Sequence, residues 1–142
     1  MKKTVLFLTL TGLTTLIITS CSKKSDSPAL SLQNVTGTYK MTAYTLVSAG
    51  VTIDAYSKLG SCERDDLLKL NADSTYNYKD AGTVCSPDGS YDGTWKLSGN
   101  YFIVDGSDSS TVTSFNGSTL VLATSDYYNG AAATFTSTYT KQ

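Results

Sequence analysis

The sequence predicts an all-β domain over residues 35–142, built as an eight-stranded antiparallel up-and-down β-barrel. Short segments rich in threonine, tyrosine, valine and serine recur along it, separated by turn signals about every 8–12 residues. No stretch has a convincing helical period, apart from one turn's length at residues 55–60. Because most connections are short, consecutive strands should pair antiparallel, and closing the sheet would remove its exposed edges.

The expected strands follow the alternation of side chains and the turn residues between them. They cover residues 37–48, 65–71, 74–80, 90–97, 101–105, 110–115, 119–124 and 132–141. Asn116-Gly117 is a strong hairpin signal, and Asn129-Gly130 precedes the last strand. Only the first connection, residues 49–63, is long. A barrel of eight strands is just wide enough to be filled by side chains or to hold one small ligand.

The apolar residues of the second and third strands determine how these two strands pair. If Asp73 is the centre of a three-residue loop, Leu70 faces Tyr76 and Leu68 faces Tyr78. The apolar side chains then share one face of the hairpin, as a half-buried sheet requires. If the loop were centred half a residue later, Leu70 would face Asn77 and Leu68 would face Lys79, which mixes apolar and polar residues on one face. We therefore expect the first register.

The first 20 residues have the order of a secretory signal. Met1-Lys2-Lys3 is a positive start, a mostly apolar run follows to Ile18, and Thr19-Ser20 are small. The run is short and rich in threonine for a spanning helix, which needs about 20 predominantly apolar residues. Ile18 to Cys21 resembles the lipobox of bacterial lipoproteins, which implies cleavage before Cys21 and a diacylglycerol on its thiol. The alternative is an ordinary secretory signal followed by a chance cysteine.

Residues 21–34 are expected to be a lipidated N-terminus and a flexible tether. Residues 22–28 are polar and have neither a strand nor a helix period. Stable anchoring takes two hydrophobic chains, and a diacylglycerol on Cys21 supplies them. We therefore expect a lipid-anchored protein of the cell envelope, held at the outer membrane on its periplasmic face or at the cell surface.

Cys62 and Cys85 are the two cysteines that remain once Cys21 is assigned to the lipid. An exported chain reaches an oxidising compartment, where a disulfide is the default state of such a pair. The expected hairpin register sets position 62 opposite position 84, so the two cysteines miss each other by one. The bridge is therefore expected at the open end of the hairpin, in loop or bulge geometry.

Composition excludes several classes of function. The chain has 11 basic and 12 acidic residues, and residues 1–20 carry two of the lysines, which leaves 9 against 12, or −3. Arg64 is the single arginine, so clustered phosphate contacts and nucleic acid binding are not expected. With no histidine and both domain cysteines oxidised, the usual triads, zinc sites and thiolate chemistry are excluded. The carboxylates are interpreted as solvated charges at strand ends, and residues 105–110 as a hairpin loop rather than a calcium site. We therefore expect no enzyme activity, metal or cofactor.

Several short motifs follow one another in a fixed order along the domain. They are Gly37-Thr38-Tyr39, Cys62, the run from Asp66 through Asn71-Ala72-Asp73 to Thr75-Tyr76, Cys85, Gly93-Thr94-Trp95 and Thr138-Tyr139-Thr140-Lys141. In this order they are similar to the lipocalin-like domains of Gram-negative lipoproteins. Tyr39 stands where that family often has tryptophan, and Leu70 where phenylalanine is common. The resemblance implies an up-and-down β-barrel and does not imply a particular ligand.

Aromatic residues on the strands are the remaining functional signal. Tyrosines inside a barrel need partners for their hydroxyl groups, which suits either a polar-lined pocket or a filled core. The short strands favour the filled core. The candidate ligand-binding residues are Tyr39, Tyr76, Tyr78, Trp95 and Tyr139. Tyr127 and Tyr128, expected in the last loop, are candidates for contact with a partner.

Two functions remain open at this point. The first is a monomeric, membrane-anchored lipoprotein whose lipocalin-like domain binds a small hydrophobic ligand. The alternative is a structural or interaction protein of the envelope, with a filled barrel that acts through its loops. An open apolar cavity of about 300 Å³ or more would favour the first, and a barrel packed shut with aromatic side chains would favour the second.

Overall fold

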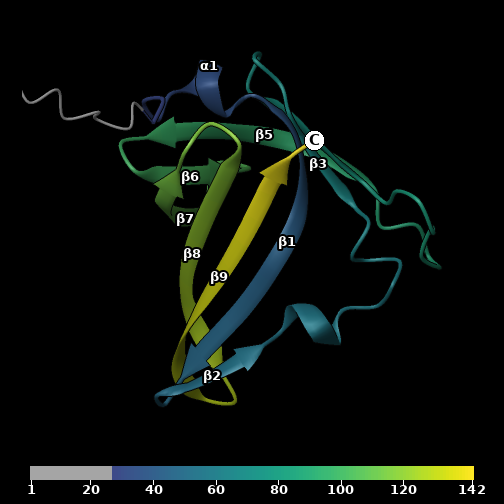
Figure 1. The fold of residues 1–142 in the computed structure, drawn as a ribbon, viewed down its shortest axis with the longest axis vertical. Helices are drawn as coiled ribbons and strands as arrows, with labels where there is room; N and C mark the ends of the chain where they lie inside the picture. Colours follow the sequence, from purple (N-terminus) through teal and green to yellow (C-terminus); the bar gives the residue numbers. More distant parts are fainter. Residues whose placement is uncertain (1–26) are drawn as a thin grey trace, which may run out of the picture.

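The structure, a computed structural model, describes residues 27–142, so the expected signal segment and Cys21 lie outside it. A short helix, α1 (Leu32–Val35), precedes the strands, and a 3-10 turn, η1 (Tyr56–Lys58), follows the second of them. The strands are β1 (Gly37–Ser48), β2 (Val51–Asp54), β3 (Leu67–Leu70), β4 (Thr75–Lys79), β5 (Tyr91–Ser98), β6 (Tyr101–Val104), β7 (Asp108–Phe115), β8 (Thr119–Tyr128) and β9 (Ala131–Lys141) (Figure 1). Within the described residues, no helix has the length and apolar character needed to cross a membrane.

Eight of these strands close into the expected barrel. From β3 to β9 each strand pairs antiparallel with the next, and β1 pairs with both β3 and β9. The closing pair of strands is long, running from Tyr39 opposite Lys141 to Ser48 opposite Ala133. The predicted fold class, an eight-stranded antiparallel up-and-down barrel, is therefore confirmed.

The strand β2 lies within the long first connection, where no strand is expected from the sequence. Its turn is Ala49-Gly50, and both residues have positive φ angles, 49° and 76°. Such angles match the turns that join the strands of tight hairpins, but Ala-Gly is a weaker signal for them than Asn-Gly. β3 pairs only with the first four residues of β1, and β2 pairs with the last four. β2 thus covers an edge of β1 that would otherwise be unpaired.

The last hairpin is longer than the sequence predicts. β8 and β9 stay paired to Tyr128 opposite Ala131, whereas the expected strand ends at residue 124. Together with β1 they form a long ribbon that extends beyond the barrel, with β2 at its far tip (Figure 1). Tyr127 and Tyr128 are therefore strand residues at the ribbon tip and not residues of a loop.

The hairpin of β3 and β4 has the predicted register. Leu70 pairs with Tyr76, and Leu68 pairs with Tyr78. The turn is stabilised by Asp73, whose Oδ1 accepts hydrogen bonds from the backbone N of Thr75 at 3.0 Å and from its hydroxyl at 2.6 Å. The need to keep the apolar residues on one face thus selects this register, as expected.

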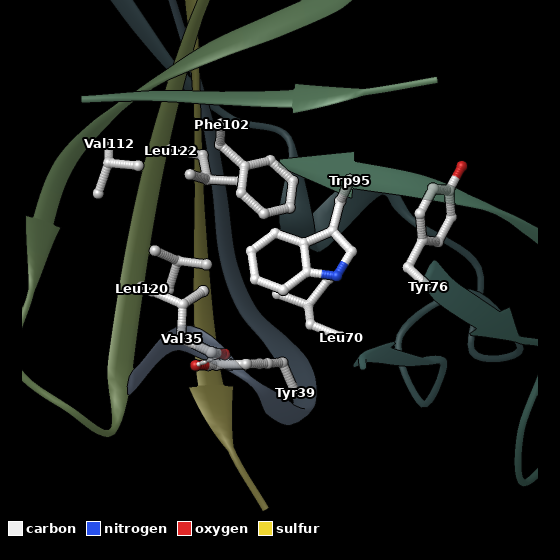
Figure 2. Close-up of a cluster of buried hydrophobic side chains, with 9 residues drawn as sticks. All are labelled: Val35, Tyr39, Leu70, Tyr76, Trp95, Phe102, Val112, Leu120 and Leu122. Atoms are coloured by element: carbon white, nitrogen blue, oxygen red, sulfur yellow. Dashed lines mark hydrogen bonds between the residues drawn. The ribbon is translucent and has the colours of Figure 1, made fainter. Parts of the chain in front are cut away.

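A buried core and α1 close one end of the barrel (Figure 2). Two polar aromatic groups in this core are hydrogen-bonded to the backbone. The Tyr39 hydroxyl donates to the carbonyl of Val35 at 2.7 Å, and the Trp95 indole N–H donates to the carbonyl of Asn71 at 3.1 Å. The first bond ties α1 to β1, and the second ties β5 to the turn after β3. The core consists of Val35, Tyr39, Leu70, Tyr76, Trp95, Phe102, Val112, Leu120 and Leu122.

Residues 30–34, which belong to the expected tether, include a capped helix start and two leucines packed against the core. The Ser31 hydroxyl accepts a hydrogen bond from the backbone N of Asn34 at 3.2 Å and so caps α1. Leu30 and Leu32 pack against the core. The last residues of the expected tether thus form part of the closed end, and the two leucines are the sequence signal for this.

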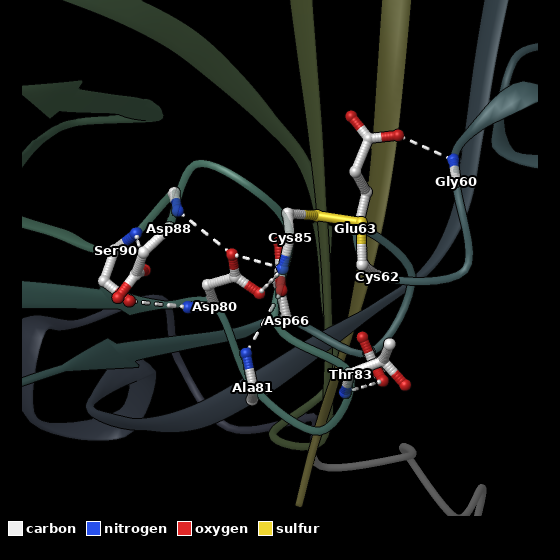
Figure 3. Close-up of a disulfide and its surroundings, with 12 residues drawn as sticks. Gly60, Cys62, Glu63, Asp66, Asp80, Ala81, Thr83, Cys85, Asp88 and Ser90 are labelled. Carbon is white, nitrogen blue, oxygen red and sulfur yellow. Dashed lines mark hydrogen bonds between the residues drawn. A yellow bond between two sulfur atoms is a disulfide. The ribbon is translucent and has the colours of Figure 1, made fainter.

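The disulfide between Cys62 and Cys85 lies at the open end of the β3–β4 hairpin, as expected (Figure 3). Its Cα atoms are 5.3 Å apart, and it joins the loop before β3 to the loop after β4. Beside it, the Asp80 carboxylate is 4% exposed and accepts from the backbone N of Cys85 at 2.9 Å and of Gly89 at 3.0 Å. The carboxylate satisfies loop N–H groups that no strand pairs. The disulfide and the Asp80 carboxylate together hold the loop before β3 and the loop after β4 in place at this end of the hairpin.

Replacing both domain cysteines, Cys62→Ser with Cys85→Ser, should lower the free energy of unfolding by about 3 kcal/mol, because the open loop regains chain entropy. The fold should persist, since the core at the closed end contains neither cysteine. Denaturant unfolding followed by circular dichroism measures the change, and the reduced parent chain is the matched control. A double variant as stable as the oxidised parent would contradict the expectation.

Candidate ligand-binding site

Toward the open end, the barrel interior contains a hollow of about 200 Å³, which we call the cup. Seven of the eight barrel strands contribute to it, from β3 to β9. Four of its side chains are tyrosines, four are apolar and one is a serine. They are Leu68, Tyr76, Tyr78, Tyr91, Phe102, Val104, Ser110, Leu122 and Tyr139.

A second hollow of about 350 Å³, which we call the mouth, adjoins the cup, and Tyr78 lines both. The disulfide-bridged loops form much of its wall. Its lining is Met41, Tyr44, Leu59, Glu63, Asp66, Tyr78, Asp80, Cys85, Pro87 and Gly89. Ligand pockets usually have volumes of about 300–1,000 Å³. The cup, at about 200 Å³, is smaller than this and below the volume stated above as favouring a binding function, and the adjoining mouth falls within the range.

Two carboxylates accept hydrogen bonds from tyrosines of the cup. The Tyr76 hydroxyl donates to Oδ2 of Asp105 at 2.8 Å, and the Tyr78 hydroxyl donates to Oδ2 of Asp66 at 2.8 Å. Asp105 also accepts from the backbone N of Thr94 at 2.8 Å. Each phenol is therefore fixed at its oxygen while its ring lines the cup.

Three of the four tyrosines of the cup form an aromatic wall. The rings of Tyr78 and Tyr91 are stacked with centroids 5.0 Å apart. Tyr76 meets Tyr91 edge-on, with a centroid distance of 5.9 Å and an angle of 89°. Tyr91 itself is 55% exposed, so it is the tyrosine of the wall that solvent reaches most. Such edge-on and offset pairs are favourable beyond the area they bury.

Gly93 makes room for this arrangement on β5. A Cβ atom at Gly93 would lie 2.6 Å from Cε1 of Tyr76 and would also overlap the carboxylate of Asp105. Real Cβ atoms do not approach other atoms so closely, so a larger residue would displace Tyr76 or Asp105. The glycine thus allows the Tyr76 ring to lie against the backbone of β5.

A family model described as a lipocalin-like domain matches residues 35–122, from the end of α1 into β8. The chain belongs to this family. The match confirms the lipocalin-like part of the resemblance seen in the sequence. Lipocalin-like barrels generally bind ligands and do not catalyse reactions. No curated protein matches the chain.

The five candidate ligand-binding residues lie in two different parts of the lipocalin-like barrel. Tyr76, Tyr78 and Tyr139 line the cup. Tyr39 and Trp95 are 0% and 2% exposed and do not line it. Their polar atoms bind the backbone at the closed end, so the structure gives them a place in the core. The interior is therefore filled at one end and open at the other.

The structure also brings residues to the site that were not among the candidates. Tyr91 lies on the same face of β5 as Trp95, four residues away, so strand alternation is a signal that could have found it. Asp66 and Asp105 lie in loops next to β3 and β6, and no local pattern links them to Tyr78 and Tyr76. Among residues 27–142, no three His, Cys, Asp or Glu side chains come together as a set that could hold a metal ion.

Burial shifts the titration of the interior tyrosines. It raises the pKa of Tyr39 and of Tyr139 to about 12, from an ordinary value of 10.0. For Tyr76 and Tyr78, burial and then the hydrogen bond to a carboxylate raise the pKa as well. The folded domain therefore holds these phenol protons at a pH where the unfolded chain releases them.

The domain should lose stability as the pH rises from about 10 toward 12. The pKa of these tyrosines is higher in the folded domain than in the unfolded chain, where it is 10.0. Their contribution to the free energy of unfolding is therefore complete below pH 10.0 and is lost as the pH rises through the pKa of the folded domain. Denaturant unfolding at each pH, with tyrosinate absorbance recorded in parallel, measures this loss. The Tyr78→Phe variant should show a shallower decline. A free energy of unfolding that stays constant over this window would contradict the expectation.

Proposed function

We propose that this protein is a membrane-anchored lipoprotein whose lipocalin-like domain binds a small hydrophobic ligand at the cup. The observation that carries the proposal is the cup itself, an interior hollow of about 200 Å³ that shares Tyr78 with the adjoining mouth. Apolar side chains and tyrosine rings make up its wall. The hydroxyls of Ser110, Tyr91 and Tyr139 are the polar groups that can orient a ligand, because those of Tyr76 and Tyr78 already bond to carboxylates. This is the composition expected of a small-molecule site.

The shape of the interior supports a short ligand. Trp95, Phe102 and Leu70 belong to the closed core, and the rings of Trp95 and Phe102 stack with centroids 5.6 Å apart. Phe102 also forms part of the cup lining, so the packed core begins directly where the cup ends. A long acyl chain would have to displace this core, whereas a compact apolar group fits above it.

The proposed anchor, a diacylglycerol on Cys21, would hold the domain near a membrane of the cell envelope, with the outer membrane as the expected one. Ser27 lies six positions after Cys21 along the chain, and six Cα–Cα steps can span at most about 20 Å. Leu30 and Leu32 then pack at the closed end of the barrel. In this arrangement the closed end lies nearest the membrane and the mouth is free to receive a ligand from the surrounding compartment.

One observation favours the alternative, an interaction protein of the envelope. The ribbon tip exposes large side chains, with Tyr127 at 74% and Val51 at 60% exposed. Exposed aromatic side chains of this kind are frequent in protein interfaces. The tip lies far from α1, so it would point away from a membrane that holds the N-terminus (Figure 1).

Filling the cup should abolish ligand binding. Ser110 lines the cup, and Ser110→Leu adds an apolar side chain to that space. Its neighbour Ser109 is exposed and lines none of the cup, so Ser109→Leu is the matched control. Titration with the neutral fluorescent dye N-phenyl-1-naphthylamine should give binding in the parent and the control, and at least about tenfold weaker binding in Ser110→Leu.

Equal dye binding by Ser110→Leu and the parent, with both variants folded by circular dichroism, would place the ligand outside the cup. No binding by the parent chain would remove the support for the binding function and favour the interaction protein.

The anchor is tested at Cys21. Cys21→Ser should abolish incorporation of labelled palmitate and move the protein from the membrane to the soluble fraction, because the lipid-bearing thiol is lost. Ser22→Ala, one residue along, should leave both properties unchanged. A Cys21→Ser chain that still fractionates with the membrane would show that the anchor lies elsewhere.

A further inference from the structure

We propose that the cup selects an organic cation, a compact apolar body that carries an ammonium group, over neutral or anionic molecules of the same shape. This inference rests on the proposed binding function and adds the charge class of the ligand. It follows from the aromatic wall, from the charges around it and from the side chains that line the two hollows.

The aromatic wall supplies the first part of the argument. The ring of Tyr91 contacts those of both Tyr76 and Tyr78, and Tyr139 completes a set of four tyrosines around one hollow. The face of an aromatic ring is electrically negative and attracts ammonium groups, and cages of such rings bind quaternary ammonium ligands. An apolar ligand needs no such density of tyrosine, since aliphatic side chains would fill the same role.

The hydrogen bonds of the cup strengthen this preference. Tyr76 and Tyr78 each donate their hydroxyl proton to a carboxylate at 2.8 Å. Donation to an anion polarises the phenol and increases the electron density of its ring. The two rings are therefore better acceptors for a cation than free tyrosines would be.

The carboxylates that accept these bonds have no basic partner in the hydrogen bonds of the described residues. Asp66 accepts from Tyr78 and from the backbone N of Ala81, and Asp105 accepts from Tyr76 and from the backbone N of Thr94. Those neutral donors leave the net negative charge in place. Asp66 is half-buried and lines the mouth, so its charge acts there through a medium less polarisable than water, whereas Asp105 is exposed and water screens its charge.

The lining of the mouth has the same sign. Glu63, Asp66 and Asp80 contribute to it, and none of the described residues that line the cup or the mouth is a lysine or arginine. An anionic ligand such as a fatty acid would enter against these charges and find no positive group to pair with its carboxylate. A cation would be attracted by the carboxylates of the mouth and by the tyrosine rings of the cup.

A series of three ligands that share a benzyl group and differ in charge tests the inference, the cation and the neutral member having the same shape. The probes are benzyltrimethylammonium, its neutral carbon isostere neopentylbenzene, and phenylacetate as the anion. Isothermal titration calorimetry on the Cys21→Ser chain, which carries no lipid, should give an affinity for the cation at least about tenfold higher than for the isostere. Phenylacetate should bind more weakly than either.

Two pairs of variants separate the contributions. Tyr91 and Tyr101 are each 55% exposed, but only Tyr91 lines the cup, so Tyr91→Leu should weaken cation binding several-fold and Tyr101→Leu should not. Asp66→Asn should also weaken cation binding, whereas Asp92→Asn, on an exposed residue outside both hollows, removes the same charge without effect. Affinity for the neutral isostere should change by less than about twofold in Tyr91→Leu and Asp66→Asn.

The outcomes distinguish this inference from the function on which it rests. Equal affinity for the cation and its isostere, or tighter binding of phenylacetate, overturns the cation preference and leaves a hydrophobic binding site. Failure of all three probes and of N-phenyl-1-naphthylamine to bind overturns both.

Discussion

The pairing of β1 with β9 is the constraint on which the rest of the structure depends. β1 is the first strand and β9 the last, and their ladder joins them from Tyr39 opposite Lys141 to Ser48 opposite Ala133. Without it the sheet would have two open edges and no interior. Because the sheet closes into a barrel, its inward side chains face one another across a narrow interior. Those side chains either fill the interior or form the wall of a cavity.

The barrel does both, at opposite ends. At the closed end, α1 and the indole of Trp95 fill the interior, and backbone carbonyls accept the hydrogen bonds of the buried Tyr39 and Trp95. At the open end, tyrosine hydroxyls turn outward to carboxylates and leave their rings around the cup. The disulfide and Asp80 hold the loops that surround the mouth. Tyrosine thus packs in the core at one end and lines the cup at the other. The difference is whether its hydroxyl bonds to a backbone carbonyl, as in Tyr39, or to a carboxylate, as in Tyr76 and Tyr78.

Local patterns account for much of what could be predicted. Alternation identified seven of the eight barrel strands to within two residues at either end, β8 being longer than expected, and the register of Leu70 opposite Tyr76 followed from keeping apolar residues on one face. β2 escaped prediction because Ala49-Gly50 is a weak turn signal, and α1 because a four-residue helix has no period to detect. Asp66 and Asp105 escaped because their partners, Tyr78 and Tyr76, lie 12 and 29 positions away.

The sequence by itself determined the fold class, the disulfide pair and five of the inward aromatic residues, because these follow from alternation, turn residues and the cysteine count. Only the tertiary structure decided which of those aromatics line a cavity. Tyr39 and Tyr139 have the same strand pattern, yet Tyr39 is buried in the core and Tyr139 lines the cup. The alternation of side chains along a strand predicts which ones point into the barrel. Their position along the barrel axis depends on the stagger between neighbouring strands. That stagger is established only when β9 meets β1.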